Sequence, residues 1–192
     1  MRKKEDLRIQ KTKSTLYRGL IELMKNESFE DIKVSNICSK SKINRSTFYD
    51  HFADKYELLQ SLMDDLKIEL EESLEVTKET TTIKEYYIET VDLLLSHVTD
   101  NINIYSSVIK NNKNSIAHDM MVDSVIKFVN NYISENYINE SSISTETIVE
   151  FYASGLIAVI FDEMKNPATF KKENIVNYFK ILIPDIDFFK KK

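Results

Sequence analysis

The stretch Lys33–Leu59, KVSNICSKSKINRSTFYDHFADKYELL, decides the fold of this chain. It predicts two short helices, over about 35–41 and about 45–51, joined by a turn of about three residues. This arrangement is a helix-turn-helix. Phe48 and Phe52 are one turn apart on the second helix, so both face the core. The N-terminal end of the second helix is left exposed, and this is the end that enters a major groove of DNA.

The exposed end of the second helix carries side chains suited to reading DNA. They are Arg45, Ser46, Thr47 and Tyr49. An arginine donates two hydrogen bonds to guanine, and a serine or threonine contacts several bases or phosphates. The sequence therefore predicts a nucleic-acid contact here.

A long helix is expected to follow from Asp54. The carboxylate of Asp54 is suited to capping the free N–H groups of that helix, and Glu57, three residues on, completes a capping-box pattern. Lys55 lies in the first turn, where its charge joins the positive end of the helix dipole.

Residues 43–59 strongly resemble the DNA-binding domain of the TetR family of transcriptional regulators. The family pattern has an apolar residue, small or polar residues, Thr, an apolar residue, Tyr, any residue, His and Phe. A lysine, an acidic residue and paired leucines follow. The matching residues run from Ile43 to Leu59 and cover about a quarter of the chain with their flanks. The resemblance implies an all-α homodimer with a ligand-binding C-terminal domain.

The resemblance also assigns roles to matching positions. It implies three base readers, Arg45, Ser46 and Tyr49. It implies three phosphate contacts, Thr47, His51 and Lys55. It implies one helix cap that also touches a phosphate, Ser35.

This sequence departs from the family where the turn begins. The family usually has Ala-Gly there, and this chain has Ser41-Lys42. The turn residue normally needs a positive φ, which suits Gly and penalises Lys. We therefore expect either a positive φ at Lys42 or a rebuilt turn.

Composition supports an all-α fold. The 192 residues contain only 2 Gly and 2 Pro, too few for the turns that sheets and hairpins need. A first helix is expected over about 7–25. The long helix from Asp54 is expected to end within 77–82, where β-branched hydroxyl residues cluster. Further helices are expected over about 83–98, 101–112, 121–133, 145–165 and 171–183, and Pro184 is expected to stop the last.

The charge is divided unevenly along the chain. Residues 1–56 carry 13 Lys and Arg against 8 Asp and Glu, a net charge of +5. The remaining residues carry 13 basic and 23 acidic side chains, a net charge of −10. An acidic body repels DNA phosphates and leaves the basic head as the contact face. We therefore expect a DNA-binding domain over 1–56 and a helical regulatory and dimerisation domain over 57–192.

The apolar pattern of the two expected C-terminal helices predicts a second subunit. Residues 148–161 and 175–183 are apolar nearly all round, so each helix must bury two sides. In a chain of this size a partner copy is expected to cover the second side, the alternative being burial within one subunit. The small residues Ala153, Ser154, Gly155 and Ala158 favour close helix approach.

Other classes of site find little support in the sequence. The single Cys38 excludes an internal disulfide and is read as a core residue, with redox sensing the alternative. His97 and His118 lack a third metal ligand at helical spacing, so no metal site is expected. No catalytic set or cofactor loop stands out. The longest apolar run, Leu156–Phe161, is too short for a membrane span, and no signal peptide is visible. The cytoplasm is the expected compartment.

These observations predict a dimeric, helical transcriptional regulator that binds double-stranded operator DNA. The most favoured form is a repressor released by a small-molecule effector bound in the C-terminal domain. Aromatic and methionine residues either line an effector pocket or form ordinary core; they include Tyr86, Tyr87, Tyr105, Met121, Phe128 and Tyr132. The alternative is a helix-turn-helix adaptor or coactivator whose C-terminal domain binds a protein partner. A helical enzyme is the least favoured class.

Overall fold

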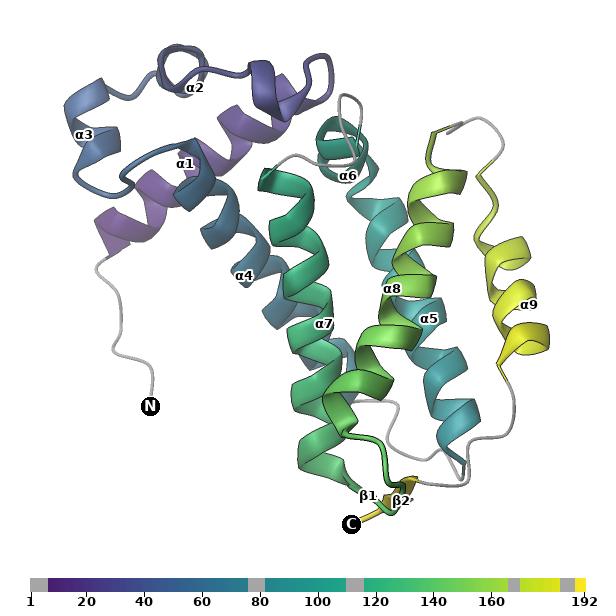
Figure 1. Ribbon diagram of the computed structural model, residues 1–192. Coiled ribbons are helices and arrows are strands. Elements are labelled where there is room, and N and C mark those ends of the chain that lie inside the picture. The colour runs from purple at the N-terminus through teal and green to yellow at the C-terminus, as the bar shows by residue number, and fades with distance from the viewer. Residues whose placement is uncertain (1–6, 76–81, 110–115, 166–169, 184–188) are drawn as a thin grey trace. The chain divides into compact units, whose positions relative to one another are not determined.

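The computed structural model of the chain describes residues 7–75, 82–109, 116–165, 170–183 and 189–192, which are mostly helical (Figure 1). The N-terminal elements are α1 (Leu7–Met24), a 3-10 turn η1 (Phe29–Asp31), α2 (Val34–Ser41), α3 (Arg45–Tyr49) and α4 (Lys55–Glu75). The later helices are α5 (Ile83–Asp100), α6 (Ile102–Ile109), α7 (Ile116–Asn136), α8 (Thr145–Glu163) and α9 (Lys172–Leu182). The predicted all-α fold is confirmed. The expected helix end within 77–82 and the stop at Pro184 involve residues outside the described ranges.

The chain forms two compact units. Unit 1 comprises residues 1–65 and 103–118, and unit 2 comprises 66–102 and 119–192. Each unit combines two separate segments of the sequence, so the compact units differ from a simple division at residue 56. The functional division into 1–56 and 57–192 stays a prediction.

Unit 1 is built around α1, which packs against α2. Its fully buried side chains come from every element of the predicted head: Leu16, Leu20, Phe29, Ile37, Phe48, Leu58 and Leu59. Residues of α6 also belong to this unit. Ser107 is completely buried, and its hydroxyl donates a hydrogen bond of 2.6 Å to the carbonyl of Glu27, just beyond α1.

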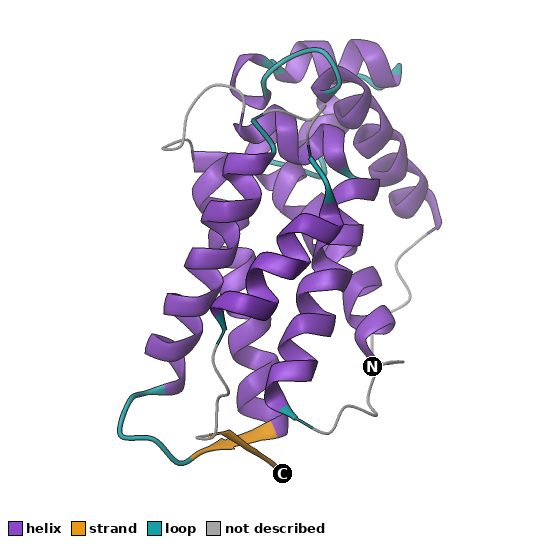
Figure 2. Cartoon of the chain, turned by 90° about the vertical axis from the view of Figure 1, so that its right-hand side faces the viewer, coloured by secondary structure: helices purple, strands orange, loops and turns teal. Residues whose placement is uncertain are grey.

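Unit 2 is a helical bundle with one short sheet. The strands β1 (Tyr137–Asn139) and β2 (Phe189–Lys191) pair antiparallel, with Tyr137 opposite Lys191 and Asn139 opposite Phe189. This pair, orange in Figure 2, was not expected from the sequence. Tyr87 of α5 packs against Tyr152 of α8 and Phe179 of α9, with ring centroids 6.1 and 6.5 Å apart. No helix in the described ranges combines the length and the hydropathy that crossing a membrane requires.

Candidate functional site

The turn of the helix-turn-helix is left-handed at Lys42, as one of the two sequence expectations required. Lys42 has φ 56° and ψ 37°. The N–H of Ile43 donates to the carbonyl of Cys38 at 3.0 Å, and the N–H of Lys42 donates to that of Ser39 at 3.3 Å. These two bonds satisfy the last carbonyls of α2 in a Schellman motif. A lysine therefore occupies a backbone conformation that glycine adopts at lower cost.

The short helix α3 presents one face to the core and one to solvent. Phe48 of α3 and Phe52, three residues beyond the end of α3, are buried, with ring centroids 5.9 Å apart. On the other face Arg45, Ser46 and Tyr49 are exposed, and half of the Tyr49 surface is accessible. The buried phenyl groups fix the helix on unit 1 and leave this face available to a ligand.

Of the remaining predicted contacts on or beside α3, Thr47 and His51 are partly exposed. Neither points fully away from the protein, as base readers must, but partial exposure is sufficient for a phosphate contact. Ser35 is exposed in the first turn of α2.

The prediction that Ser35 caps its helix was wrong. α2 begins one residue earlier than expected, because the carbonyl of Lys33 already accepts from the N–H groups of Asn36 and Ile37 at 2.9 and 3.2 Å. Lys33 therefore holds the N-cap position without a side-chain cap. The Ser35 hydroxyl lies 3.3 Å from the amide oxygen of Asn36. The predicted phosphate contact of Ser35 is a separate matter and stays a prediction.

The start of α4 is capped by the residues that the sequence indicated. Asp54 accepts hydrogen bonds from the N–H groups of Tyr56 and Glu57 at 2.8 and 2.9 Å. Glu57 accepts from the N–H of Ala53 at 2.5 Å, one residue before the usual capping-box partner. Two carboxylates therefore occupy the donors at the positive end of this helix.

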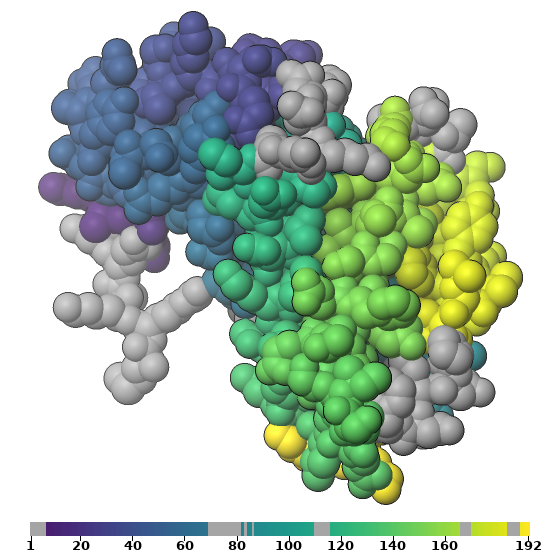
Figure 3. All heavy atoms as spheres, in the orientation of Figure 1, coloured from purple at the N-terminus to yellow at the C-terminus, as the bar shows by residue number. Residues whose placement is uncertain are grey.

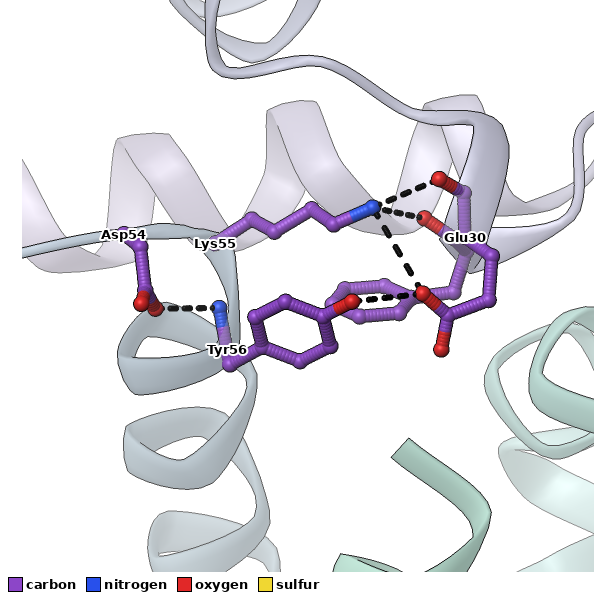
Figure 4. A network of polar contacts seen from close by, with 5 residues as sticks. Glu30, Asp54, Lys55 and Tyr56 are labelled. Carbon is purple, nitrogen blue, oxygen red and sulfur yellow. Dashed lines mark hydrogen bonds and ion pairs between the residues drawn. The ribbon is translucent and has the colours of Figure 1, made fainter. Parts of the chain in front are cut away.

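Lys55 turns its ammonium into unit 1 (Figure 4). Its Nζ donates to the carbonyls of Phe29 and Glu30 at 3.0 and 2.7 Å and lies 3.9 Å from the Glu30 carboxylate. The same atom lies 4.9 Å from the ring centre of Phe29 and 5.2 Å from that of Tyr56. Only 13% of the Lys55 side chain is exposed. The side chain thus joins the 3-10 turn η1 to the start of α4.

Tyr56 completes this network. Its hydroxyl donates a 2.6 Å hydrogen bond to Glu30 Oε2. This bond, assisted by burial, raises the pKa of Tyr56 to about 12. Burial lowers the pKa of Lys55, and the neighbouring carboxylates of Glu30, Asp31 and Asp54 oppose that shift. The network is therefore held by a desolvated cation between an acceptor-rich turn and two aromatic rings.

Unit 2 contains an apolar cavity of about 50 Å³. Its lining includes residues from α5, α7, α8 and β2, such as Tyr87, Leu94, Phe128, Ile133, Val149, Leu156 and Phe189. No lining residue is charged, and the polar groups come from Thr90 and three tyrosines. Of the residues considered from the sequence, Tyr87, Phe128 and Tyr132 line it, whereas Tyr105 and Met121 do not.

An apolar face of α8 and α9 remains uncovered on unit 2. Phe151 and Ile181 are 75% and 81% exposed, and Leu182 and Tyr178 are also exposed. A Cβ added at Gly155 would meet no atom within 4 Å. In Figure 3 the atoms of α8, light green, and α9, yellow, adjoin on the surface of this unit. We call this region the α8–α9 face.

Two features of these sites were missed by sequence reasoning. Phe189 lines the cavity from a strand at the end of the described chain, and only the aromatic pair Phe188-Phe189 marks it in the sequence. Ser107 belongs to unit 1 although it lies 80 residues after its hydrogen-bond partner Glu27. Hydrophobic periodicity does not predict a contact at that separation.

The short helix α3 follows α2 after a tight turn, is held by the buried Phe48 and leaves its other face exposed. In a helical chain this arrangement defines a helix-turn-helix protein. In a comparison with known protein families, residues 16–62 match the family described as bacterial regulatory proteins, tetR family. Residues 16–62 of this chain are therefore similar to that family.

One curated relative is similar to part of this chain, and solved structures share its fold. The uncharacterized HTH-type transcriptional regulator YxbF of Bacillus subtilis (strain 168) is 37% identical over 62 residues, which span 32% of this chain and 16% of that protein. A TetR transcriptional regulator of Streptococcus agalactiae 2603V has a similar fold, with a TM-score of 0.63 and 22% identity over 93% of this chain and 96% of that one. The transcriptional regulator FadR of Bacillus subtilis, solved in complex with stearoyl-CoA, gives a TM-score of 0.62 and 14% identity over 90% and 98% of the two chains.

Proposed function

We propose that this chain is a transcriptional regulator that binds double-stranded operator DNA through α3. The observation that carries the proposal is the two-faced packing of α3, in which Phe48 is buried against Phe52 from the turn that follows, while Arg45, Ser46 and Tyr49 are exposed. A helix in this arrangement can enter a major groove without unfolding. The match of residues 16–62 to a family of bacterial regulatory proteins supports a regulator over an enzyme.

The proposed contacts divide into reading and positioning groups. Arg45, Ser46 and Tyr49 read base edges. Thr47, His51 and Ser35 contact phosphates, which fix register without carrying sequence information. We do not include Lys55 among the phosphate contacts, because its ammonium already has two carbonyl acceptors and a carboxylate within unit 1.

The decisive experiment compares Arg45→Ala with a matched basic control. Operator DNA is first selected from a random pool and then titrated with each variant beside a scrambled duplex. Arg45→Ala is expected to cost about 1–3 kcal/mol on the operator and to relax preference at one position of each half-site. Lys127→Ala, which removes an exposed lysine of α7, should leave both affinities unchanged. Equal weakening on both DNAs would make Arg45 a backbone contact, and an unchanged Arg45→Ala would remove the basis of the proposal.

We further propose that the chain acts as a homodimer through the α8–α9 face. Phe151, Ile181 and Leu182 expose large apolar side chains there, and Gly155 leaves room for close approach. Exposed apolar patches of this kind mark association sites. A two-fold axis would also supply two recognition helices about one DNA turn apart, as palindromic operators require.

Sedimentation tests the dimer with two substitutions at one position. Gly155→Arg should yield monomer or aggregate, because a bulky charge would enter the interface. Gly155→Ala should leave the unit 2 fold intact, because its Cβ meets no atom within this chain. A wild-type monomer at micromolar concentration would contradict the dimer.

The proposed regulatory form is a repressor in the cytoplasm that leaves its operator when an effector occupies the unit 2 cavity. The absence of charged lining residues supports an apolar, uncharged effector. The alternative is an adaptor whose unit 2 binds another protein through the α8–α9 face. A ligand that raises the melting temperature and weakens operator binding would support the first function. A protein partner that binds the wild type but not Gly155→Arg would support the second.

A further inference from the structure

The unit 2 cavity has two ends that the chain path defines. The helix α5 begins at residue 83, α7 ends where β1 begins, and α8 begins soon after β1 ends. Tyr87, Ile133 and Val149 therefore lie at the β1 end, whereas Leu94, Phe128 and Leu156 lie about one and a half to two turns away along the same helices. The cavity is thus elongated along the helices.

Phe189 closes the β1 end of this cavity. It is opposite Asn139 in the strand pair, and its phenyl group packs on the buried cluster of Ile133, Tyr137, Val149 and Ala153. The other lining residues belong to α5, α7 and α8, so Phe189 is the one contribution from β2 to the lining. Side chains alternate along a strand, which is why Phe189 faces inward while Lys190 is exposed.

The two strands are held by different contacts. β1 continues directly from α7, and Asn139 fixes the path into α8 by donating to the carbonyl of Ile143 at 2.7 Å and accepting from the N–H of Ser141 at 2.9 Å. β2 is joined by a ladder of three residue pairs, and Lys192, which follows it, donates from its N–H to the carbonyl of Asn136 at 2.9 Å and from its Nζ to that of Ser134 at 2.7 Å. The ion pair between Lys190 and Glu140 is largely exposed and contributes little.

We infer that Phe189 is a specificity-determining residue that limits the length of the uncharged, apolar ligand which the unit 2 cavity admits. This inference rests on the proposed effector function of the cavity. The helices set the width of the cavity, and the phenyl group of Phe189 sets its end. Because Phe189 is the one lining residue from β2 and the other lining residues belong to the helices, substitution at 189 changes the length of the cavity and leaves its width unaltered.

The test uses the full chain and straight-chain primary alcohols of increasing length. These compete with the uncharged fluorescent probe N-phenyl-1-naphthylamine. In the wild type the affinity should rise by about fourfold for each methylene that becomes buried, equivalent to about 0.8 kcal/mol, and then stop rising when the chain reaches Phe189. In Phe189→Ala the rise should continue to longer alcohols. In Phe189→Trp it should stop at shorter ones.

Two further variants separate the phenyl group from the strand. Phe189→Leu keeps an apolar side chain at the position and should give an intermediate limit, which also protects the test if the alanine variant unfolds. Lys190→Ala breaks the exposed ion pair and should leave the limit where it is in the wild type. An identical limit in the wild type, Phe189→Leu and Phe189→Trp would overturn the inference while leaving the effector cavity in place. Failure of every variant and the wild type to bind probe or alcohol would overturn both.

Discussion

Gly19 of α1 lies against Ser41 of α2, and the two helices approach closely there. A Cβ added at Gly19 would lie 2.0 Å from Ser41 Oγ, 3.2 Å from Ser41 Cβ and 3.4 Å from the Ser41 nitrogen. Gly19→Ala is therefore expected to push the first two helices of unit 1 apart. The same contact leaves Ser41 Oγ buried without a hydrogen-bond partner.

The magnitude follows from opposing contributions. Alanine is favoured over glycine in a helix interior by about 1 kcal/mol. Overpacking at a contact this short costs about 1–3 kcal/mol, so a net loss of about 1 kcal/mol is expected. Ser41→Ala removes the unpartnered hydroxyl and should stabilise unit 1 by about 1 kcal/mol. In that background the new Cβ of Gly19→Ala meets the Cβ of residue 41 at 3.2 Å and its nitrogen at 3.4 Å, and the substitution should be close to neutral.

The assay is a double-mutant cycle measured by urea unfolding with circular dichroism. Amide hydrogen exchange of Ile37 and Cys38 in α2 reports whether the loss is local to unit 1. The two substitutions should be coupled by about 1–2 kcal/mol, because they share one contact. An equal cost of Gly19→Ala in both backgrounds would show that the Ser41 hydroxyl does not limit the helix approach. Destabilisation by Ser41→Ala alone would show that the hydroxyl has a partner.

The turn and the Lys55 network carry the remaining predictions. Lys42→Gly should raise the free energy of unfolding by about 1 kcal/mol, since the φ of Lys42 is 56°. A lower free energy of unfolding in urea would show that the backbone at Lys42 is not strained. Lys55→Met should cost about 1–3 kcal/mol of stability yet leave the salt slope of DNA binding unchanged; a slope lowered by about one would instead identify a phosphate contact. Because the pKa of Tyr56 is raised to about 12, its contribution is complete below pH 10 and is lost as the pH rises toward 12. Alkaline unfolding of Tyr56→Phe should lack that component.

Local signals predicted the helix-turn-helix well. The spacing of Phe48 and Phe52 identified the buried face of α3, and Asp54 identified the start of α4. The departure at Lys42 left two alternatives, a positive φ or a rebuilt turn, and the first is confirmed. Each of these features depends on residues within a few positions of one another, where sequence and geometry are tightly linked.

Features that depend on distant partners were not predicted. The β1–β2 pair joins residues about 50 positions apart, and neither strand is long enough to show alternation. Ser35 missed the cap position because the carbonyl of Lys33 starts α2 one residue early, a shift within the ordinary uncertainty of helix ends.

The direction of Lys55 bears on how the protein would hold DNA. A lysine in the first turn of α4 is long enough to reach outward to a phosphate or inward to a turn, and its sequence position is the same in both cases. Here η1 offers two carbonyls and Glu30, while Asp54 and Glu57 already occupy the N–H groups at the start of the helix. The first turn of α4 therefore has neither a free ammonium from Lys55 nor those amides to offer a phosphate. Charge neutralisation at the operator must then come from exposed cations nearer α3, such as Lys33, Lys42 and Arg45, and the salt slope should respond to these residues.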